Sequence, residues 1–345
     1  MRLRPLLAVA LLAAACAAPP PPLPAYTPPA YTPPAYTPPA DIPSATATPP
    51  SPTTATTPAT PQWRALADAP TPRTEVTATR VAGEVVVVGG MIDSWTPLPL
   101  TEVYDIAADR WRTGPDLPVG AHHAMSATVG HAAYVFGGYD GARDPMTGVY
   151  RLDGDAWTAL APMPEARAAG VAVALDGRVF VVGGIGPGGV ADHMLVYDVA
   201  ADHWSAAAGP PTPREHLAGT AVDGRVHTFG GRVGGNLSAH EVYDPAARTW
   251  SALAPLPTAR SGLGSASPCP GMAVVIGGEG ANTFAEVEVY SAGADSWSAL
   301  PPSPHPRHGL GVVSVDGAVL TLVGGPRPGL TASVVAEAIN VPCGR

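Results

Sequence analysis

Lysine is absent from the sequence, so every basic side chain among its 345 residues is arginine or histidine. Charged residues make up only 14% of the chain, and the net charge is −9. An acidic chain without a basic cluster is poorly suited to bind nucleic acid or an anionic membrane surface. We therefore expect no nucleic-acid partner for this protein.

Long apolar runs are also missing, and only the first residues resemble a targeting signal. Arg2 and Arg4 form a positive segment, residues 6–12 are apolar, and three alanines precede Cys16. This pattern is typical of an export signal, and its apolar part is too short to span a bilayer. Small residues directly before a cysteine resemble the bacterial lipobox, although Ala13 stands where that motif favours leucine.

The signal has two possible outcomes for Cys16. We expect residues 1–16 to be a signal peptide and Cys16 to be lipidated, which would make this lipid the only membrane contact. The alternative is cleavage after an Ala-x-Ala triplet, with Cys16 discarded. Both outcomes place the protein outside the cytoplasm, in the cell envelope or beyond it, where disulfides are permitted.

Residues 17–61 are rich in proline, threonine and alanine, and they repeat Ala-Tyr-Thr-Pro-Pro around Tyr26, Tyr31 and Tyr36. Proline blocks both helix formation and sheet pairing, and this composition cannot bury a core. The segment is expected to be a disordered, extended linker. Its repeats could alternatively serve as ligands for proline-binding domains.

From Trp63 onward four features recur in a fixed order with a period near 47 residues. The repeated tryptophans are Trp63, Trp111, Trp157, Trp204, Trp250 and Trp297. Glycine doublets begin at Gly89, Gly137, Gly183, Gly230, Gly277 and Gly324. Val-Tyr pairs end at Tyr104, Tyr150, Tyr197, Tyr243 and Tyr290, and an arginine follows five of the tryptophans at Arg73, Arg167, Arg214, Arg260 and Arg307.

Each period also has the pattern of four antiparallel strands and no helix. A small apolar run leads to an Asp-Gly turn such as Asp223-Gly224, which favours a hairpin, and a β-branched run follows up to the glycines. Repeated four-stranded units of this length are typical of propeller blades. We therefore predict an all-β, six-bladed β-propeller over residues 62–345, with the strand at Trp63 completing the last blade near residues 334–339.

The repeated residues resemble the kelch family, whose pattern combines Pro-x-x-Arg, an Asp-Gly hairpin, Gly-Gly, Val-Tyr-Asp and Trp. The resemblance covers residues 62–342 and implies the propeller fold, with the repeated Trp and Tyr packed in the core. The second repeat has Ala121-His122-His123 where the arginine is expected, and Arg151 and Ser291 replace the Asp after Tyr in the second and fifth repeats. The last repeat lacks the Tyr and has residues 335–338 in its place.

The five arginines begin the innermost strand of each blade and are candidates for an anion-binding ring. Arginines that converge in a concavity suit carboxylates. His122, His123, His216, His305 and His308 would lie at the same mouth. The alternative is that each arginine is structural and binds loop carbonyls within its own blade.

The loops after the glycine doublets hold further candidates. Trp95 and Tyr139 could stack on a sugar or anchor a peptide, or could pack on their own loops. Residues 184–189 match Gly-x-Gly-x-x-Gly, but no helix follows to hold a pyrophosphate, so we expect no dinucleotide. We find no zinc spacing and no cysteine near a tyrosine as in galactose oxidase, a copper enzyme on a kelch-type propeller, so no metal or cofactor is predicted.

Cys269 and Cys343 are predicted to lie in adjacent blades on the face opposite the arginines. They could form a disulfide or remain free, because sequence does not give their separation.

Three functions fit these features. The leading hypothesis is a monomeric, non-catalytic binding scaffold of the cell envelope, whose arginine-bearing face meets a protein or an anionic glycan. The second is a sugar-modifying enzyme, because some exported bacterial kelch proteins are sialic-acid epimerases; its candidate residues would be the five arginines with Glu75, Glu165, Glu215 and His216. The third is a structural component of the envelope.

Overall fold

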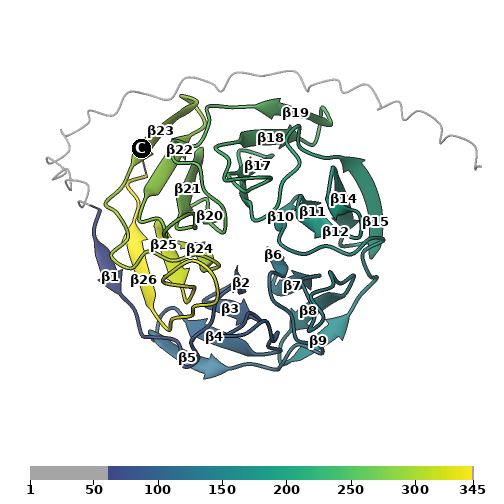
Figure 1. The fold of residues 1–345 in the computed structure, drawn as a ribbon, viewed down its shortest axis with the longest axis horizontal. Helices are drawn as coiled ribbons and strands as arrows, with labels where there is room; N and C mark the ends of the chain where they lie inside the picture. Colours follow the sequence, from purple (N-terminus) through teal and green to yellow (C-terminus); the bar gives the residue numbers. More distant parts are fainter. Residues whose placement is uncertain (1–60, 344–345) are drawn as a thin grey trace, which may run out of the picture. The chain divides into compact units, whose positions relative to one another are not determined.

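The computed structural model describes residues 61–343, which form six four-stranded antiparallel sheets arranged in a ring (Figure 1). The expected signal peptide, the linker through residue 60 and the lipidation site Cys16 lie outside the described residues. Within residues 61–343 every regular element is a strand, and no helix there has the length and apolar character that crossing a membrane requires. The predicted six-bladed β-propeller is therefore confirmed.

Each blade runs from an innermost strand at the channel to an outermost strand at the rim (Figure 1). Blade 1 contains β2 (Thr77–Val81), β3 (Glu84–Val88), β4 (Thr101–Asp105) and β5 (Arg110–Thr113). Blade 2 contains β6 (Met125–Val129), β7 (Ala132–Phe136), β8 (Val149–Asp153) and β9 (Ala156–Ala159). Blade 3 contains β10 (Val171–Leu175), β11 (Arg178–Val182), β14 (His193–Asp198) and β15 (His203–Ala208), with the small hairpin β12 (Ile185–Gly186) and β13 (Gly189–Val190) in its long loop.

The remaining blades repeat this order. Blade 4 contains β16 (Ala218–Val222), β17 (Arg225–Phe229), β18 (His240–Asp244) and β19 (Thr249–Ala252). Blade 5 contains β20 (Gly264–Ala266), β21 (Met272–Ile276), β22 (Val287–Ser291) and β23 (Ser296–Ala299). Blade 6 contains β24 (Gly311–Val315), β25 (Ala318–Leu322) and β26 (Ala336–Asn340), and β1 (Trp63–Ala65) supplies its outermost strand.

The ring closes through the pairing of β1 with β26. The two strands are antiparallel, with Trp63 opposite Ile339 and Ala65 opposite Glu337. The first and last colours of the described chain therefore lie side by side in Figure 1. This closure covers the outer edge of β26 and was predicted from the order of features in the sequence.

The tryptophans tie neighbouring blades together at the rim. In all six blades the indole N–H donates to a backbone carbonyl at the end of, or just after, the outermost strand of the preceding blade, as from Trp204 to Ala161 at 2.9 Å and from Trp63 to Pro301 at 3.0 Å. The rings are only half-buried, so they act as inter-blade latches and are not fully enclosed core residues. Tyr104 and Tyr290 are enclosed, and their hydroxyls donate to Asp109 and Asp295.

Strand pairing corrects the alignment of two repeats. In blade 2, Tyr150 lies opposite Val135 and so occupies the position that Glu102 holds in blade 1. The position opposite the tryptophan, which is a tyrosine in other blades, is Leu152 in blade 2. Arg151 therefore does not replace the Asp of the kelch pattern, which Asp153 supplies. The expected Val149-Tyr150 match was wrong because the two residues fit the letters of the pattern but not its register.

The last glycine doublet is also displaced by one residue. Gly324 N–H donates to Arg73 O at 2.7 Å, the bond that the second glycine makes in other blades, for example from Gly90 to Ala121. The first position is thus held by Val323, which has a positive φ of 51°. Left-handed backbone is costly for a β-branched residue, so this position carries strain that glycine avoids elsewhere.

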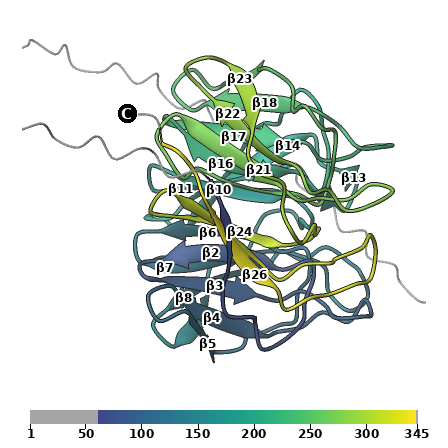
Figure 2. The same cartoon turned by 90° about the vertical axis from the view of Figure 1, so that its left-hand side faces the viewer.

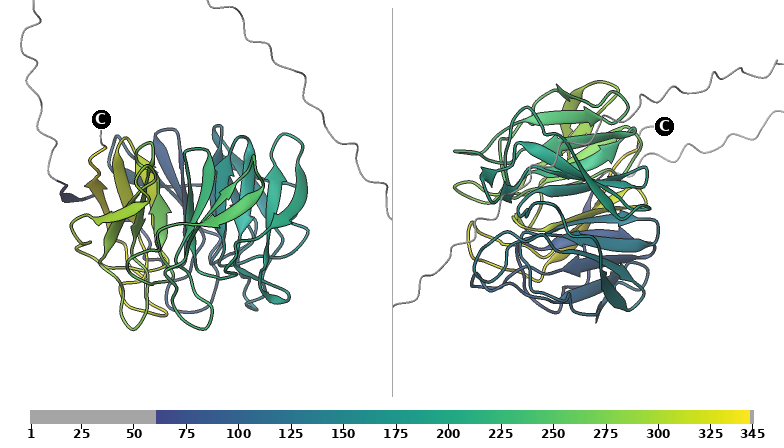
Figure 3. Two further views of the ribbon diagram at one scale, coloured as in Figure 1. Left: turned by 90° about the horizontal axis from the view of Figure 1, so that it is seen from above. Right: turned by 90° about the vertical axis from the view of Figure 1, so that its right-hand side faces the viewer.

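The two faces of the ring differ in the length of their connections (Figures 2 and 3). One face carries short turns such as Asp223-Gly224, where both residues have positive φ, as a two-residue hairpin turn of this type requires. The other, which we call the loop face, carries the long connections. These are residues 66–76, 89–100, 114–124, 137–148, 160–170, 183–192, 209–217, 230–239, 253–263, 277–286, 300–310 and 323–335.

A disulfide joins Cys269 to Cys343, with their Cα atoms 5.6 Å apart. It links the hairpin turn of blade 5 to the segment that follows β26, on the short-turn face. The sequence had left this pair open between bonded and free.

Candidate functional site

The five repeated arginines are buried, so the prediction that they surround an open channel mouth is wrong. Their exposed fractions are 0% or 1%. Each guanidinium binds carbonyl or carboxylate groups of the protein, in line with the structural alternative stated for these residues. The side chains of these arginines therefore offer almost no accessible surface to a partner that approaches the loop face.

In four blades the buried partner is a glutamate on the third strand. Arg73 donates to Glu102 at 2.8 Å and Arg307 to Glu337 at 2.8 Å. Arg214 and Arg260 make the equivalent contacts to Glu241 and Glu288, both at 2.5 Å. Sequence reasoning missed these glutamates, although a visible signal existed: Glu directly precedes Val-Tyr in three of the repeats.

The exceptions support this pairing. Blade 2 has Ala121 at the arginine position and Tyr150 at the glutamate position, so both charges are absent together. Blade 3 has Leu195 at the glutamate position, and Arg167 instead contacts Glu165 at 3.2 Å and His193 at 3.0 Å. A buried charge needs a partner, which explains why the two positions change in concert.

The central channel is lined by small and hydroxyl-bearing side chains of the innermost strands. A cavity of about 370 Å³ lies among residues such as Thr79, Ser126 and Thr220. Thr77 and Thr79 bond Ser126 and Thr128 across the first blade boundary, each at 2.6 Å. Arg80 is the only charged residue among those that line this cavity.

At the loop face the channel is bordered by a ring of backbone hydrogen bonds. One residue per blade contributes, and each has a positive φ near 50–65°. In blades 2 to 6 the N–H of this residue donates to the carbonyl of its equivalent in the preceding blade, as from His123 to Glu75 at 3.0 Å and from Ala169 to His123 at 2.9 Å. The six residues are Glu75, His123, Ala169, His216, Gly262 and Gly309; Val76 N–H closes the ring onto Gly309 at 3.3 Å.

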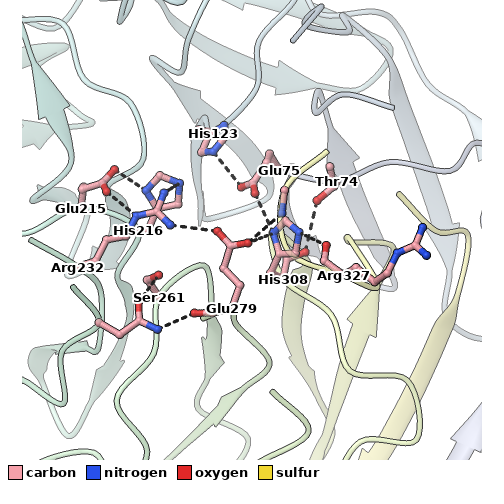
Figure 4. A network of polar contacts seen from close by, with 12 residues as sticks. Thr74, Glu75, His123, Glu215, His216, Arg232, Ser261, Glu279, His308 and Arg327 are labelled. Atoms are coloured by element: carbon pink, nitrogen blue, oxygen red, sulfur yellow. Dashed lines mark hydrogen bonds and ion pairs between the residues drawn. The ribbon is translucent and has the colours of Figure 1, made fainter. Parts of the chain in front are cut away.

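Charged and imidazole side chains gather at this ring, and we call them the mouth cluster: Glu75, His123, Glu215, His216, Arg232, Glu279 and His308 (Figure 4). Glu75 binds His123 Nε2 at 3.2 Å through one carboxylate oxygen and His308 Nδ1 at 3.1 Å through the other. Glu75 belongs to blade 1 and His308 to blade 6, so this contact also crosses the closure of the ring.

His308 is held in its charged form. Its Nδ1 faces the Glu75 carboxylate and its Nε2 faces the Arg327 carbonyl at 3.0 Å, so both nitrogens must donate. Burial alone would lower the pKa of His308, but the hydrogen bond and charge of Glu75, together with Glu279, raise it. Burial would likewise raise the pKa of Glu75, and the surrounding histidines lower it instead.

The other side of the mouth cluster is centred on His216. Its Nδ1 lies 2.5 Å from Glu215 Oε2, and its Nε2 accepts from Arg232 at 3.1 Å (Figure 4). Arg232 also donates to Glu215 at 2.6 Å and to Glu279 at 3.0 Å. Burial would raise the pKa of Glu215, but His216 and Arg232 bring it down to about 2, so this carboxylate is ionised at neutral pH.

The predicted aromatic candidates lie beside this cluster. Tyr139 and Trp95 flank the buried His122, with ring centroids 5.4 and 5.8 Å from it. Burial raises the pKa of Tyr139 to about 12, so its hydroxyl stays protonated. Trp95 is 39% exposed, and the guanidinium of Arg143 lies 4.5 Å from its ring centre.

All exposed large apolar side chains of residues 61–343 belong to the loop face. They are Ile92, Trp95, Val233 and Leu330, with exposed fractions of 37%, 39%, 49% and 36%. They come from the long loops of blades 1, 4 and 6, while the short-turn face has none among the described residues. Sequence reasoning selected only Trp95 of these four.

The structure thus brings His122, His123, His216 and His308 together as predicted, but separates His305, which is exposed and pairs with Glu337. Arg232 and Glu279 were missed although each directly follows a Gly-Gly doublet, because the residue type at that position differs from blade to blade. The candidate set for sialic-acid chemistry is not assembled, because its five arginines are enclosed and Glu165 lies with Arg167 and His193, away from Glu75.

Comparison with known proteins supports the repeat assignment. Residues 72–118 and 122–164 match the Kelch motif. The chain is 32% identical to Kelch-like protein 23 of Mus musculus over 124 residues, which are 34% of this chain and 22% of that protein. It is 28% identical to Kelch-like protein terF of Aspergillus terreus over 139 residues, which are 37% of this chain and 29% of that protein.

A third similar protein is an F-box/kelch-repeat protein of Arabidopsis thaliana, 37% identical over 83 residues, which are 21% of this chain and 22% of that protein. The matched region thus spans less than a third of each of these relatives. The likeness concerns the kelch repeats, and nothing in it extends to the activities of the whole relatives.

Proposed function

We propose that this protein is a lipid-anchored binding scaffold of the cell envelope that presents its loop face to a protein partner. The observation that carries the proposal is the confinement of the exposed large apolar side chains to that face. Exposed apolar groups gathered on one surface are typical of an interaction site. Kelch propellers commonly bind proteins, which agrees with the kelch motif in this chain.

The exposed charges suggest the chemistry of the partner. The loop face has seven exposed acidic side chains: Asp68, Asp93, Asp116, Asp144, Glu165, Asp192 and Glu286. Arg143 and Arg327 are its exposed arginines. Since acidic groups predominate and the repeated arginines are enclosed, we favour a partner surface with apolar and basic side chains over the anionic glycan first considered.

Trp95 is the strongest anchor candidate on this face. It is large, rigid and half-accessible, and Arg143 holds its ring by a cation–π contact. Truncation of such a central aromatic residue typically weakens a protein complex by about 2 kcal/mol or more.

Site-specific photo-cross-linking in the living envelope tests the binding face. A photoreactive residue at Leu330 or at Ile92 should capture the same protein, because these loops belong to adjacent blades of one face. The matched control is His131, which is exposed on a short turn of the opposite face. Capture from His131 and not from the loops would contradict the proposal.

A serine variant of Ile92, Trp95, Val233 and Leu330 tests the energetic role of these side chains. We expect it to lose the captured partner while its melting temperature stays near that of the wild type, since exposed residues contribute little to stability. Full retention of the partner would show that these residues are not the binding surface. Cys16→Ala tests the anchor separately: the protein should move from the membrane fraction to the soluble fraction.

A further inference from the structure

We infer that Glu75, His123 and His216 form a binding site for a first-row divalent transition-metal ion, with Zn²⁺ the favoured ion. The ligand atoms that these three residues offer lie within 4.8 Å of one another (Figure 4). Two imidazole nitrogens and one carboxylate oxygen form a common ligand set for such ions, and further positions stay open for water or another ligand. The inference is independent of the proposed partner-binding function.

Both histidines are oriented by their second ring nitrogen. His216 Nδ1 lies 2.5 Å from Glu215, and His123 Nδ1 lies 2.6 Å from His122 Nδ1. Histidines that ligate metals are usually fixed in this way, because a hydrogen bond at one nitrogen sets the tautomer and presents the other to the ion. His123 Nε2 already points at the Glu75 carboxylate.

The three side chains project from a rigid frame. Each belongs to a different blade, and each lies in the backbone hydrogen-bond ring at the mouth. Their φ angles of 52°, 54° and 51° match those of Ala169 (55°), Gly262 (64°) and Gly309 (54°) at the same position in the other blades. The shared backbone conformation holds the three side chains in fixed directions at the mouth.

The charge of the mouth cluster also favours a cation. Three carboxylates, from Glu75, Glu215 and Glu279, lie in this cluster beside a single guanidinium, that of Arg232. The side chains of Glu75, His123 and His216 are less than a tenth exposed. A divalent ion would therefore meet net negative charge in a partly desolvated site, where attraction is stronger than in bulk water.

The Arg232 side chain has to release His216 before His216 can bind a metal ion. Its Nη2 donates to His216 Nε2 at 3.1 Å, so metal binding has to release this contact. The side chain is one-third exposed, and its other nitrogens retain Glu215 and Glu279. One hydrogen bond is therefore exchanged for a metal bond while both ion pairs remain.

The test is metal binding by the full chain, purified without an affinity tag and stripped with chelator. Titration calorimetry with Zn²⁺ alone should give one ion per chain. Co²⁺ bound to the wild-type chain should show visible ligand-field absorption. His123→Ala and His216→Ala should each weaken Zn²⁺ binding at least about tenfold, and Glu215→Gln should weaken it about tenfold through the orientation of His216.

His193→Ala is the matched control, because His193 also contacts a glutamate, Glu165, but has no second histidine beside it. It should leave Zn²⁺ affinity unchanged. Absence of Zn²⁺ binding at 1 mM would overturn the inference, and so would undiminished binding in both folded ligand variants. If those variants do not fold, the Co²⁺ spectrum of the wild-type chain decides: lack of absorption by bound Co²⁺ at saturating metal refutes the site.

Discussion

At the scale of single residues, the enclosed arginines stabilise the blades and do not recognise a partner. Arg214 donates to Glu241, to the carbonyls of Gly230 and Thr212, and to Thr228. Such a guanidinium satisfies several buried acceptors at once, so its loss leaves a charge and several dipoles without partners.

Arg214→Met should therefore lower the free energy of unfolding by about 3–5 kcal/mol, since it leaves the Glu241 carboxylate buried and unpaired. Adding Glu241→Leu, the residue that blade 3 has at this position, should restore more than half of the loss. Urea denaturation of the three proteins measures both effects. Equal stability of the single and double variants would refute the coupling.

A second buried polar pair lies within blade 4. His227 Nδ1 and His240 Nε2 are 3.0 Å apart, and His240 Nδ1 donates to the Ala254 carbonyl at 2.9 Å. Burial is the main cause that lowers the pKa of each histidine to about 4. Both rings are neutral in the folded protein near neutral pH.

This pair predicts a loss of stability in mild acid. The unfolded histidines bind protons near pH 6.5, well above the folded pKa, so the unfolded state gains protons first as the pH falls. Stability should decrease from about pH 6.5 towards pH 4, by up to about 3 kcal/mol per histidine. The variant His227→Val/His240→Val introduces the residues that blade 5 has at these positions, Val274 and Val287. Its free energy of unfolding, measured by urea denaturation, should change less between pH 6.5 and pH 4 than that of the wild type.

At the scale of strands and blades, the tryptophan latch sets how neighbouring sheets are joined. Trp204 packs on Tyr197 and, edge to face, on Phe136 of the preceding blade, with centroids 4.8 and 5.9 Å away. Trp204→Ala should cost about 3 kcal/mol. Trp63 has the same N–H contact but faces Ile339 in place of a tyrosine, so Trp63→Ala should cost about 1 kcal/mol less. Thermal unfolding with matched denaturant curves compares the two.

The strand order was predictable because glycines, turns and tryptophans recur with one period. The number of repeats gives the number of blades, and the order of features in the first and last repeats gives the closure. The strand register was predictable only where the repeat pattern was intact. The prediction was wrong in blade 2, where Val149-Tyr150 has the letters of the Val-Tyr pair but lies two residues before the position that faces the tryptophan. The direction of a side chain was not predictable from the repeat. Arg73 has the same place in the sequence whether it binds a ligand or stabilises its blade, and only the structure shows that it pairs with Glu102. Arg232 and Glu279 occupy the same repeat position, 47 residues apart, but the residue type at that position varies between blades, so the period did not predict their ion pair.

At the scale of the whole molecule, the disulfide reinforces the closed ring. Cys269 and Cys343 are 74 residues apart, and their bond ties blade 5 to the end of the strand that pairs with β1. The variant Cys269→Ser/Cys343→Ser should be about 2–4 kcal/mol less stable. Hydrogen exchange should accelerate first in β1 and β26; earlier acceleration in blade 3 would show that the bond does not protect the closure.

The pairing of residues 63–65 with residues 337–339 also fixes when the protein can finish folding during its synthesis. The first strand to leave the ribosome stays without its neighbour until the last blade has been translated. An exported chain would thus remain incomplete while it is threaded across the membrane, and the ring could form only on the far side. A nonsense mutation before residue 336 would remove β26 and leave β1 without the strand that it pairs with. The shortened chains should therefore be degraded by proteases and should not form smaller closed propellers.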